Sequence, residues 1–599
     1  MLTQQIKSAA LEALQHFFPD QSFDLGLISV NETKSEFTGD YTVVLFPFVK
    51  MLRQKPDELG NKLGAWLTEQ HPELFSAFQV VSGFLNLTVN DRFFLDMLSG
   101  NWNNQCYGTA AASGKKVMIE YSSPNTNKPL HFGHLRNNFL GYAVGNILRV
   151  NGDTVVKANL VNDRGIHICK SMVAWQHFAQ GATPESSGIK GDHLVGDYYV
   201  RFNDEYKAQV KELMASGMSE ELAEKEAPIM KEAQQMLRAW EAGDEAVVSL
   251  WKQMNAWVYA GFDITYKNLG IDFDKFYYES NTYLLGKAIV EKGLEKGVLF
   301  RKEDNSVWID LTADGLDQKL LLRGDGTSVY MTQDLGTAVL KYNDFGLDRS
   351  VYVIADEQNY HMQVLQLILK KLGEPCADGI FHLSYGMVEL PSGRMKSREG
   401  TVVDADDMID EMISMAEQQT KENGKADGFT DEEQKELYRM IGLGALKFYL
   451  LRVDPKKKMI FNPQESIDLH GFTATFIQYA HARICSVLRR EQLPVMPAAD
   501  VFAGKSVGDG LFEAEKHILK MLEQYPVAVE TAAKEMSPSV LCNYCFSLAQ
   551  AFNTFYDRHS IAKAESEEKK QMRLMTVVMI ARTLRHAMSM LGIELPEKM

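Results

Sequence analysis

The sequence predicts an α/β protein built around a parallel sheet, and three observations lead to this prediction. Short apolar runs typical of buried strands alternate with helical patterns from residue 116 onwards. Residues 466–599 place their apolar side chains almost entirely at helical spacing. The first 112 residues mix both patterns. We therefore expect a Rossmann-type, doubly wound domain with a helical insertion, a small N-terminal α+β domain and a C-terminal all-α helix bundle.

Length, composition and charge narrow the class of protein. A chain of 599 residues with 45% hydrophobic and 24% charged residues is typical of a soluble globular protein with several domains. No apolar run approaches the roughly 18 residues that a membrane span needs. Six scattered cysteines indicate a reducing cytoplasm. The net charge of −16 excludes a uniformly basic surface but allows local basic patches for nucleic acid.

The N-terminal domain is expected to cover 1–112. Residues 101–116 are rich in Gly, Ala, Ser and Asn, which is typical of a linker. The expected elements before this linker are helices over 6–17 and 56–70 and strands over 41–45 and 84–89.

The Rossmann-type domain is expected over 113–404. Long charged helical segments interrupt its alternation of strands and helices between about 180 and 314, and we interpret them as a helical insertion. A helical connecting region should follow over 405–465, and the helix bundle over 466–599. The expected elements of the sheet domain are strands over 117–121, 154–160, 350–355 and 381–390 and helices over 135–148 and 363–372.

The chain is organised around residues 119–136, where a strand pattern passes through a turn into a helix. His131 and His134 lie three residues apart, so at a helix start both face the same side. Gly133 leaves room for a ligand to approach the backbone, and Lys128 adds a cation. The free N–H groups of a first helical turn favour a polyphosphate. We interpret this turn as a nucleotide triphosphate site, although HxGH alone also occurs by chance.

A second segment has matching chemistry. Residues 393–403 form a Gly-bounded loop that contains Arg394, Lys396 and Arg398. Three cations on such a loop can stabilise the charge that develops on a leaving pyrophosphate. Taken alone, the loop would be interpreted as a solvated surface turn.

Together the two segments resemble the HIGH and KMSKS motifs of class I aminoacyl-tRNA synthetases. More closely, residues 117–599 resemble arginyl-tRNA synthetase, and the N-terminal unit with Gly83-Phe84-Leu85-Asn86 resembles the additional domain of that family. The similarity rests on the E-x-S-S-P-N-x-x-K-P-x-H-x-G-H-L-R block at 120–136, N-D-x-G at 162–165, Y-x-T-x-D at 330–334, the loop at 395–402 and F-x-Q-Y-A-H-A-R at 476–483.

Two positions depart from the family pattern. Phe132 occupies the second place of HIGH, and Ser397 stands where the second lysine of KMSKS is expected. In this family such a loss is commonly accompanied by a lysine just before the first motif, and Lys128 occupies that place. The resemblance therefore assigns phosphate neutralisation to Lys128.

The resemblance implies ATP-dependent attachment of L-arginine to its tRNA through arginyl-adenylate. It implies a monomer with ATP, L-arginine and tRNA(Arg) as partners, Mg²⁺ that arrives with the nucleotide, and no metal held by the protein. The implied catalytic residues are Lys128, His131, His134, Lys396 and Arg398. Those for ATP are His131, Gly133, His134, His361 and Met395. Those for arginine are Glu120, Ser123, Asn125, Tyr330, Asp334 and Gln358, and those for tRNA are Asn86, Phe476, Tyr479 and Met599.

Physical chemistry supports the arginine assignment, because the planar donors of a guanidinium require carboxylates such as Glu120 and Asp334, with Tyr330 packed on its face. Two alternatives stay open at the level of residues. Tyr330 and Asp334 could lie on a hairpin strand after Asp325-Gly326, and Phe476 and Tyr479 could be core residues of one helix face.

Four rival functions also stay open. Activation of glutamate would require basic residues in place of the two carboxylates, and activation of cysteine would require thiolate–zinc ligands, which the scattered cysteines do not offer. A nucleotidyltransferase that uses HxGH without tRNA is typically compact, unlike this chain. An inactive tRNA-binding relative would be compatible with the altered loop at Ser397.

Overall fold

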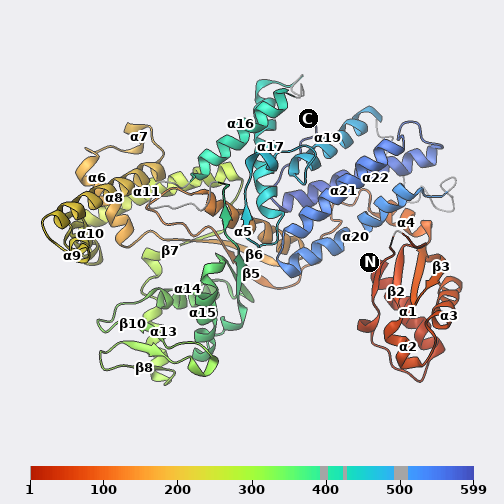
Figure 1. Cartoon of the computed structure of the whole chain (residues 1–599), viewed down its shortest axis with the longest axis horizontal. Helices are drawn as coiled ribbons and strands as arrows, with labels where there is room; N and C mark the ends of the chain where they lie inside the picture. Colours follow the sequence, from red (N-terminus) through yellow and green to blue (C-terminus); the bar gives the residue numbers. More distant parts are fainter. Residues whose placement is uncertain (1, 35, 392–402, 423–427, 492–509) are drawn as a thin grey trace.

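The computed structural model describes residues 2–34, 36–391, 403–422, 428–491 and 510–599. The parallel sheet lies in the middle of the elongated molecule, with the N-terminal domain on one side and the helices that follow the second strand of the sheet on the other (Figure 1). The predicted fold class, with its parallel sheet, small N-terminal domain and helical C-terminal domain, is confirmed.

The central sheet has the strand order β12-β11-β5-β6-β7, and all of its neighbouring strands are parallel. Chain order reverses beside β5, because β6 follows on one side and β11 and β12 lie on the other. Crevices outside the carboxyl ends of strands at such a reversal are where doubly wound sheets bind ligands. The strands are β5 (Lys116–Glu120), β6 (Thr154–Val161), β7 (Lys275–Tyr278), β11 (Arg349–Ala355) and β12 (Ile380–Tyr385).

Helix α5 (Phe132–Val150) packs directly on the first strand of this sheet. A Cβ atom at Gly141 would lie 2.4 Å from Cβ of Tyr121, so helix and strand approach too closely there for any other residue. The predicted helices of this domain are confirmed within a few residues of their ends. The further helices around the sheet are α6 (Ile166–Phe178), α12 (Glu279–Thr282), α13 (Gly286–Glu295), α14 (Tyr330–Phe345), η3 (Asp356–Gln358), α15 (Asn359–Leu372) and η4 (Ala377–Gly379).

The segment interpreted as a helical insertion is helical only in its first part, and the prediction is wrong for the rest. Lys275–Tyr278 is strand β7, which pairs with β6 and belongs to the central sheet. Farther on, three short strands form a separate antiparallel sheet, which begins inside the same segment. These parts are α7 (Pro184–Ser187), α8 (Gly191–Ala215), α9 (Glu220–Glu226), α10 (Pro228–Glu241), α11 (Glu245–Leu269), β8 (Leu299–Arg301), β9 (Val307–Ile309), η2 (Thr312–Asp314) and β10 (Lys319–Leu322).

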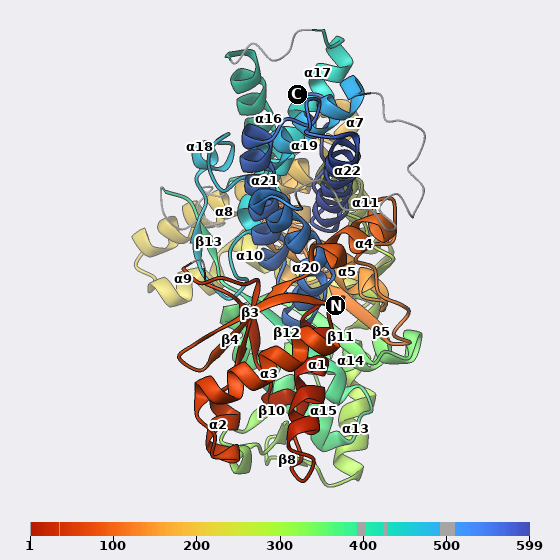
Figure 2. The same cartoon turned by 90° about the vertical axis from the view of Figure 1, so that its right-hand side faces the viewer.

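The N-terminal domain contains an antiparallel sheet with the order β1-β2-β4-β3, and helices pack against it (Figure 2). Its first helix reaches the C-terminal bundle, where the backbone N–H of Leu2 donates to Glu523 Oε1 at 2.6 Å. The elements are α1 (Leu2–Phe17), η1 (Leu25–Leu27), β1 (Val30–Glu32), β2 (Tyr41–Val44), α2 (Phe46–Leu52), α3 (Pro56–Gln70), β3 (Phe75–Val81), β4 (Phe84–Val89) and α4 (Asp91–Asn101).

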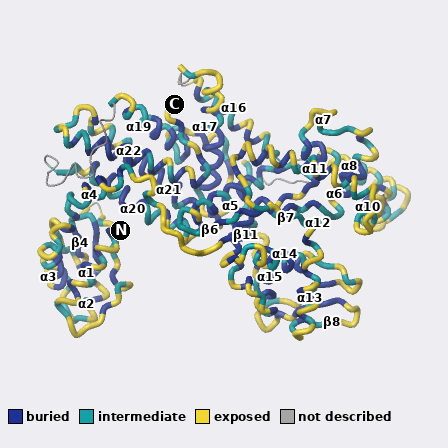
Figure 3. The backbone as a smooth tube through the Cα atoms, turned by 180° about the vertical axis from the view of Figure 1, so that it is seen from behind, coloured by how far each residue is buried: buried dark blue, intermediate teal, exposed yellow. Residues whose placement is uncertain are grey.

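In the described residues of the C-terminal part, the elements are helices and one short parallel pair, β13 with β14. Buried residues run continuously from the sheet domain into this bundle (Figure 3). The elements are β13 (Val388–Glu389), α16 (Ala405–Glu422), α17 (Asp431–Leu451), β14 (Met459–Ile460), α18 (Pro463–Ser466), α19 (Ala474–Glu491), α20 (Glu513–Glu535), α21 (Ser539–Arg558) and α22 (Glu567–Met590).

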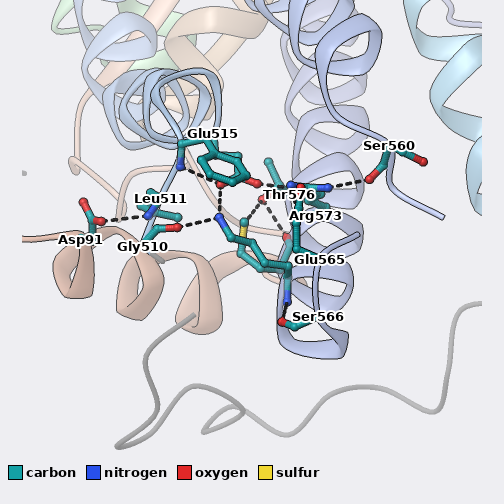
Figure 4. A network of polar contacts seen from close by, with 12 residues as sticks. Asp91, Gly510, Leu511, Glu515, Ser560, Glu565, Ser566, Arg573 and Thr576 are labelled. Carbon is teal, nitrogen blue, oxygen red and sulfur yellow. Dashed lines mark hydrogen bonds and ion pairs between the residues drawn. The ribbon is translucent and has the colours of Figure 1, made fainter. Parts of the chain in front are cut away.

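A buried ion network joins two helices of the bundle (Figure 4). Glu515 on α20 lies 2.5 Å from Lys569 Nζ and accepts a hydrogen bond from Arg573 Nε at 2.8 Å, both on α22. The three side chains are at most 2% exposed. Each charge therefore depends on its partners rather than on water.

None of the helices in the described residues combines the length and the apolarity needed to cross a lipid bilayer.

Candidate active site

Two predicted motifs leave the carboxyl edge of the central sheet side by side. The segment after β5 pairs with the segment after β6 through a bridge between Asn125 and Asn162. The N–H of Thr126 donates to the carbonyl of Asn162 at 3.0 Å, and the N–H of Asn162 donates to the carbonyl of Pro124 at 2.9 Å. The first motif and the N-D-x-G element therefore form one unit of backbone.

The turn directly after β5 is held in an uncommon conformation. Ser122 and Ser123 have φ values of 73° and 46°, in the left-handed region that few side chains adopt. Buried amides compensate, because Asn137 Oδ1 accepts from the N–H of Ser122 at 2.6 Å and Asn159 Oδ1 from that of Ser123 at 3.1 Å. Such strain is typical of binding sites. The side chains of Ser123 and Asn125 are both exposed.

The two-histidine turn, residues 128–134, begins helix α5. His131 is the N-cap, and its Nδ1 accepts from the N–H of Gly133 at 3.1 Å. His134 Nδ1 accepts from the N–H of His131 at 3.0 Å. A Cβ at Gly133 would lie 2.9 Å from the His131 ring, so glycine is required here by the imidazole itself.

Burial sets the protonation state of both rings, and these hydrogen bonds set which nitrogen carries the proton. Burial and the nearby Lys128 lower the pKa of His131 to about 4. Burial, together with His131 and Lys128, holds the pKa of His134 well below its usual range. Both imidazoles are therefore neutral at pH 7. Because each Nδ1 accepts a hydrogen bond, the proton of each ring is on Nε2, which can donate to an anion.

The end of the second motif pairs with this turn. The N–H of Phe132 donates to the carbonyl of Val403 at 2.9 Å, and the N–H of Ala405 donates to that of Leu130 at 3.0 Å. Residue 131 forms an antiparallel bridge with Asp404. The predicted residues Met395, Lys396 and Arg398 lie outside the described residues.

The predicted carboxylates belong to one cluster, the acid–lysine cluster of Glu120, Asp334, Lys341 and His361. Glu120 ends strand β5, and its Oε2 lies 2.5 Å from Lys341 Nζ on α14. Asp334, on the same helix, lies 2.6 Å from Nε2 of His361 on α15. The charges of Glu120 and Asp334 both raise the pKa of Lys341, which overcomes the effect of its complete burial.

Tyr330 is the first residue of α14, so the alternative of a hairpin strand at Tyr330 and Asp334 is wrong. Its side chain is 72% exposed, although a hydrophobic side chain of this size is usually buried. It borders a cavity of about 530 Å³ at the carboxyl edge of the sheet. That cavity also has Asn125, Arg164 and Glu279 in its wall. Gln358, at the end of η3, is exposed after the neighbouring strand β11.

Three residues of this region escaped the sequence analysis. Lys341 lies seven residues after Asp334, a signal that becomes readable only once the segment is known to be a helix. Glu279 follows strand β7, and burial together with Asp334 and Asp163 raises its pKa to about 7. Arg164 pairs with Glu241 at 3.0 Å and lies 3.9 Å from the centre of the Tyr283 ring. Nothing in the one-letter pattern indicated either contact.

In the N-terminal domain, the predicted tRNA contact Asn86 is buried. Its Oδ1 accepts from Thr42 Oγ1 at 2.7 Å, while its Nδ2 has no hydrogen-bond partner among the described residues. Asn86 lies in the wall of a cavity of about 290 Å³ that also contains Lys34 and the partly exposed Phe84. A buried amide without a partner is costly unless a ligand completes it.

In the bundle, Phe476 and Tyr479 both lie on α19 and are half-buried. Phe476 packs 5.0 Å from the ring of Phe546, and the Arg483 guanidinium lies 5.0 Å from the ring of Tyr479. Met599 packs against the same core. The structure thus gives Phe476 a core contact, and each of the three side chains keeps some exposure.

Three family models match consecutive parts of the chain. The model described as tRNA synthetases class I (R), catalytic domain, matches residues 98–462. The model of the DALR anticodon binding domain matches residues 477–599, and that of the arginyl tRNA synthetase N terminal domain matches residues 2–89.

Individual relatives agree with these matches. A Bacteroides thetaiotaomicron protein named arginine–tRNA ligase is 51% identical over 584 residues and covers 96% of both chains. A Porphyromonas gingivalis protein of the same name is 49% identical over 600 residues and covers 100% of both. The solved structure of Thermus thermophilus arginyl-tRNA synthetase covers 100% of both chains with a TM-score of 0.79 and 25% identity. The chain belongs to the arginyl-tRNA synthetase family of class I tRNA synthetases.

Proposed function

We propose that this protein attaches L-arginine to tRNA(Arg) in two steps, with ATP consumed to AMP and pyrophosphate. The observation that carries the proposal is the pair of neutral histidines at the carboxyl edge of the sheet, on the same strand–helix unit as a buried carboxylate of the acid–lysine cluster. The identity of about 50% to arginine–tRNA ligases over the whole chain supports the same activity.

In the first step, an oxygen of the arginine carboxylate attacks the α-phosphorus of ATP. The bond between that phosphorus and the bridging oxygen breaks, so arginyl-adenylate forms and pyrophosphate leaves with the electron pair. The protein supplies no nucleophile, and its contribution is to position the substrates and stabilise charge. His131 and His134 donate their Nε2 protons as hydrogen bonds to phosphate oxygens without losing them, and Lys128 offsets the negative charge. We assign Met395 to ATP binding and Lys396 and Arg398 to the pyrophosphate.

We assign the recognition of arginine to the acid–lysine cluster and to Tyr330. Asp334 accepts hydrogen bonds from the guanidinium, with Glu120 as the second carboxylate and Tyr330 packed on the planar face. Glu120 already pairs with Lys341, so it would share its charge between that ammonium and the substrate.

The α-amino and carboxylate groups of arginine are held by Asn125, Ser123 and Gln358. His361 lies beside Asp334 and the nucleotide.

Mg²⁺ enters this scheme as part of the nucleotide substrate. Within the described residues, the group with ligand spacing is His193, Asp404 and Asp406. Lys190 Nζ lies 2.6 Å from Asp406 Oδ2, so an ammonium already neutralises that group. The residues present therefore do not fit a resident metal ion there.

In the second step, the arginyl group moves from the adenylate to a ribose hydroxyl of the terminal adenosine of tRNA, and AMP leaves. Asn86 contacts the D-loop, and Phe476, Tyr479 and Met599 contact the anticodon, where aromatic side chains can stack on splayed bases. We propose that the protein acts as a monomer in the cytoplasm.

The test is aminoacylation of total tRNA with each of the twenty labelled amino acids in turn. We expect charging with arginine alone. Charging with glutamate or cysteine would show that the protein is specific for that amino acid instead of arginine. Nucleotide turnover without charging would favour a nucleotidyltransferase, and tRNA binding without any turnover would favour an inactive relative.

A further inference from the structure

A clamp of four charged residues joins helix α8 to the start of helix α16, beside the two-histidine turn. Lys190 Nζ lies 2.6 Å from Asp406 Oδ2. His193 Nε2 lies 3.2 Å from Asp404 Oδ2 and 3.5 Å from Asp406 Oδ2. All four side chains are partly buried, so their attraction is stronger than that of an exposed surface pair.

Helix α11 completes the clamp. Thr265 Oγ1 donates to Asp406 Oδ1 at 2.9 Å and lies 2.5 Å from Lys190 Nζ. The fully buried Asp192 places its Oδ2 3.1 Å from the same ammonium. The carboxylates of Asp404 and Asp406 raise the pKa of His193 to about 10, so this imidazole is a cation at neutral pH. Two cations thus face Asp404 and Asp406.

One member of the clamp is also the backbone partner of the first histidine. Asp404 bridges His131, and hydrogen bonds on either side join Phe132 to Val403 and Ala405 to Leu130. Asp404 Oδ1 accepts from the N–H of Asp406 at 2.7 Å, which fixes the start of α16 to the same residue. A shift of the Asp404 side chain would therefore move the strand-like contact of the turn.

Helix α8 also contacts the turn itself. A Cβ at Gly196 would lie 2.7 Å from Cδ of Pro129 and 3.6 Å from Cα of Lys128. Helix α8, which begins after Lys190 and carries His193, therefore touches residues 128–129 directly and holds residues 404–406 through the clamp.

We propose that Lys190 and His193 are positioning residues for adenylate formation, because they fix Asp404 and Asp406 and thereby the place where His131 and His134 meet the nucleotide. They touch no substrate. A misplacement of about 1 Å in a catalytic group can lower the rate about 100-fold, which is why a clamp around this turn matters. The inference rests on the proposed role of the turn in binding ATP.

The test compares Lys190→Met and His193→Ala with Lys190→Arg, which keeps the positive charge, and with His193→Gln, which keeps a hydrogen-bond donor but not the charge. Lys267→Met is the matched control, because Lys267 lies on α11 and pairs with Asp263 at the surface, 2.6 Å away. Four quantities are measured in the full-length protein: amide hydrogen exchange of residues 130–135 and 403–407, the affinity for ATP, the rate of adenylate formation with tRNA(Arg) present, and the KM for arginine.

We expect Lys190→Met and His193→Ala to speed exchange at Phe132 and Ala405 at least tenfold and to weaken ATP binding or adenylate formation at least tenfold. The KM for arginine should stay within twofold. Lys190→Arg and the control should resemble the wild type, and His193→Gln should fall between the wild type and His193→Ala. His193→Ala should lower the rate of adenylate formation less in a His131→Ala background than in the wild type.

The proposal would be overturned if amide hydrogen exchange and ATP affinity were unchanged in Lys190→Met and His193→Ala. It would also be overturned if the KM for arginine rose by as much as the affinity for ATP fell. If His193→Ala lowered the rate of adenylate formation equally in the wild type and in His131→Ala, the proposal would also be overturned. Failure of the proposed function is distinguishable, because a wild-type protein that does not charge arginine still reports exchange and ATP affinity.

Discussion

At the scale of single residues, burial rather than charge prepares the nucleotide site. His131 and His134 are neutral because they are desolvated and lie beside Lys128, and their backbone contacts fix which nitrogen holds the proton. In the acid–lysine cluster, Lys341 neutralises Glu120, which leaves Asp334 with the partly exposed His361 as its close partner. Asp334 is therefore the carboxylate most available to a guanidinium.

Replacing Asp334 should separate arginine recognition from ATP binding. We expect Asp334→Asn to lower kcat/KM for arginine at least 100-fold, because a neutral amide cannot offer two acceptors to the guanidinium fork. ATP affinity should stay within threefold. The control is Asp344→Asn on the same helix, which keeps an acceptor for the Tyr277 hydroxyl, 2.8 Å away. Undiminished arginine turnover in Asp334→Asn would refute the assignment.

The low pKa of His131 should appear in the stability of the protein. Its folded-state pKa of about 4 lies below the ordinary value of 6.5. Between these values the unfolded chain binds a proton that the folded chain excludes, so this contribution to stability is present above pH 6.5 and is lost as pH falls towards 4. We expect the unfolding free energy of His131→Gln to fall less steeply over this range, by at most about 1.4 kcal/mol per pH unit. Parallel profiles in urea titrations would contradict the pKa shift.

The site residues illustrate how far sequence reasoning reaches. The spacing of His131 and His134 is enough to place both at one helix start, because helix geometry is local. The pairing of Glu120 with Lys341 joins residues 221 positions apart, and no local pattern encodes it. The neutral state of the histidines likewise depends on burial by distant segments.

At the scale of secondary structure elements, close contacts at glycine residues hold the site in place. Helix α5 approaches strand β5 at Gly141, and helix α8 approaches the two-histidine turn at Gly196. The long strands and helices of the sheet domain were predicted, because each has a strong apolar period. Strand β7 was not predicted, since it has only four residues, three of them aromatic, and directly follows a segment with two aspartates. Its place is set by pairing with β6, which is a tertiary contact.

Glycine 141 gives a direct test of the helix–strand contact. We expect Gly141→Ala to destabilise the protein by about 1–3 kcal/mol, because the new methyl group would overlap the Tyr121 side chain. The control is Gly100→Ala in helix α4, where a Cβ meets nothing within 4 Å. Alanine there should be neutral or stabilise by up to about 1 kcal/mol. Urea titrations that rank the two variants in the opposite order would contradict this packing.

The buried network of the bundle gives a second test at this scale. Glu515→Gln removes the carboxylate that balances Lys569 and Arg573, so we expect a loss of about 3–5 kcal/mol. The same change at Glu436, which pairs with Arg439 at the surface, should cost less than about 1 kcal/mol. Equal effects in thermal unfolding would show that the network does not stabilise the bundle.

At the scale of the whole molecule, the N-terminal domain and the C-terminal bundle are joined to each other. Lys516 on α20 lies 2.9 Å from Asp40 Oδ2 of the N-terminal domain, and the Tyr107 hydroxyl donates to the carbonyl of Leu522 at 2.8 Å. The candidate tRNA contacts Asn86 and Phe476 therefore lie on connected bodies beside the sheet domain (Figures 1 and 2).

This arrangement leads to a prediction about the first step. We expect exchange of pyrophosphate with ATP to require tRNA(Arg), since members of the resembled family generally need bound tRNA before they activate the amino acid. The measurement is the exchange rate with tRNA(Arg), with a tRNA of another specificity and without tRNA. Equal exchange in all three would show that activation is independent of the tRNA contacts.

A crystal structure with a non-hydrolysable analogue of arginyl-adenylate would test the roles of the two-histidine turn and of Asp334 together. We predict the guanidinium within hydrogen-bond distance of the Asp334 carboxylate and the phosphate-mimicking group beside Nε2 of His131 and His134. A guanidinium bound away from both Asp334 and Glu120, or a nucleotide away from the two histidines, would contradict it.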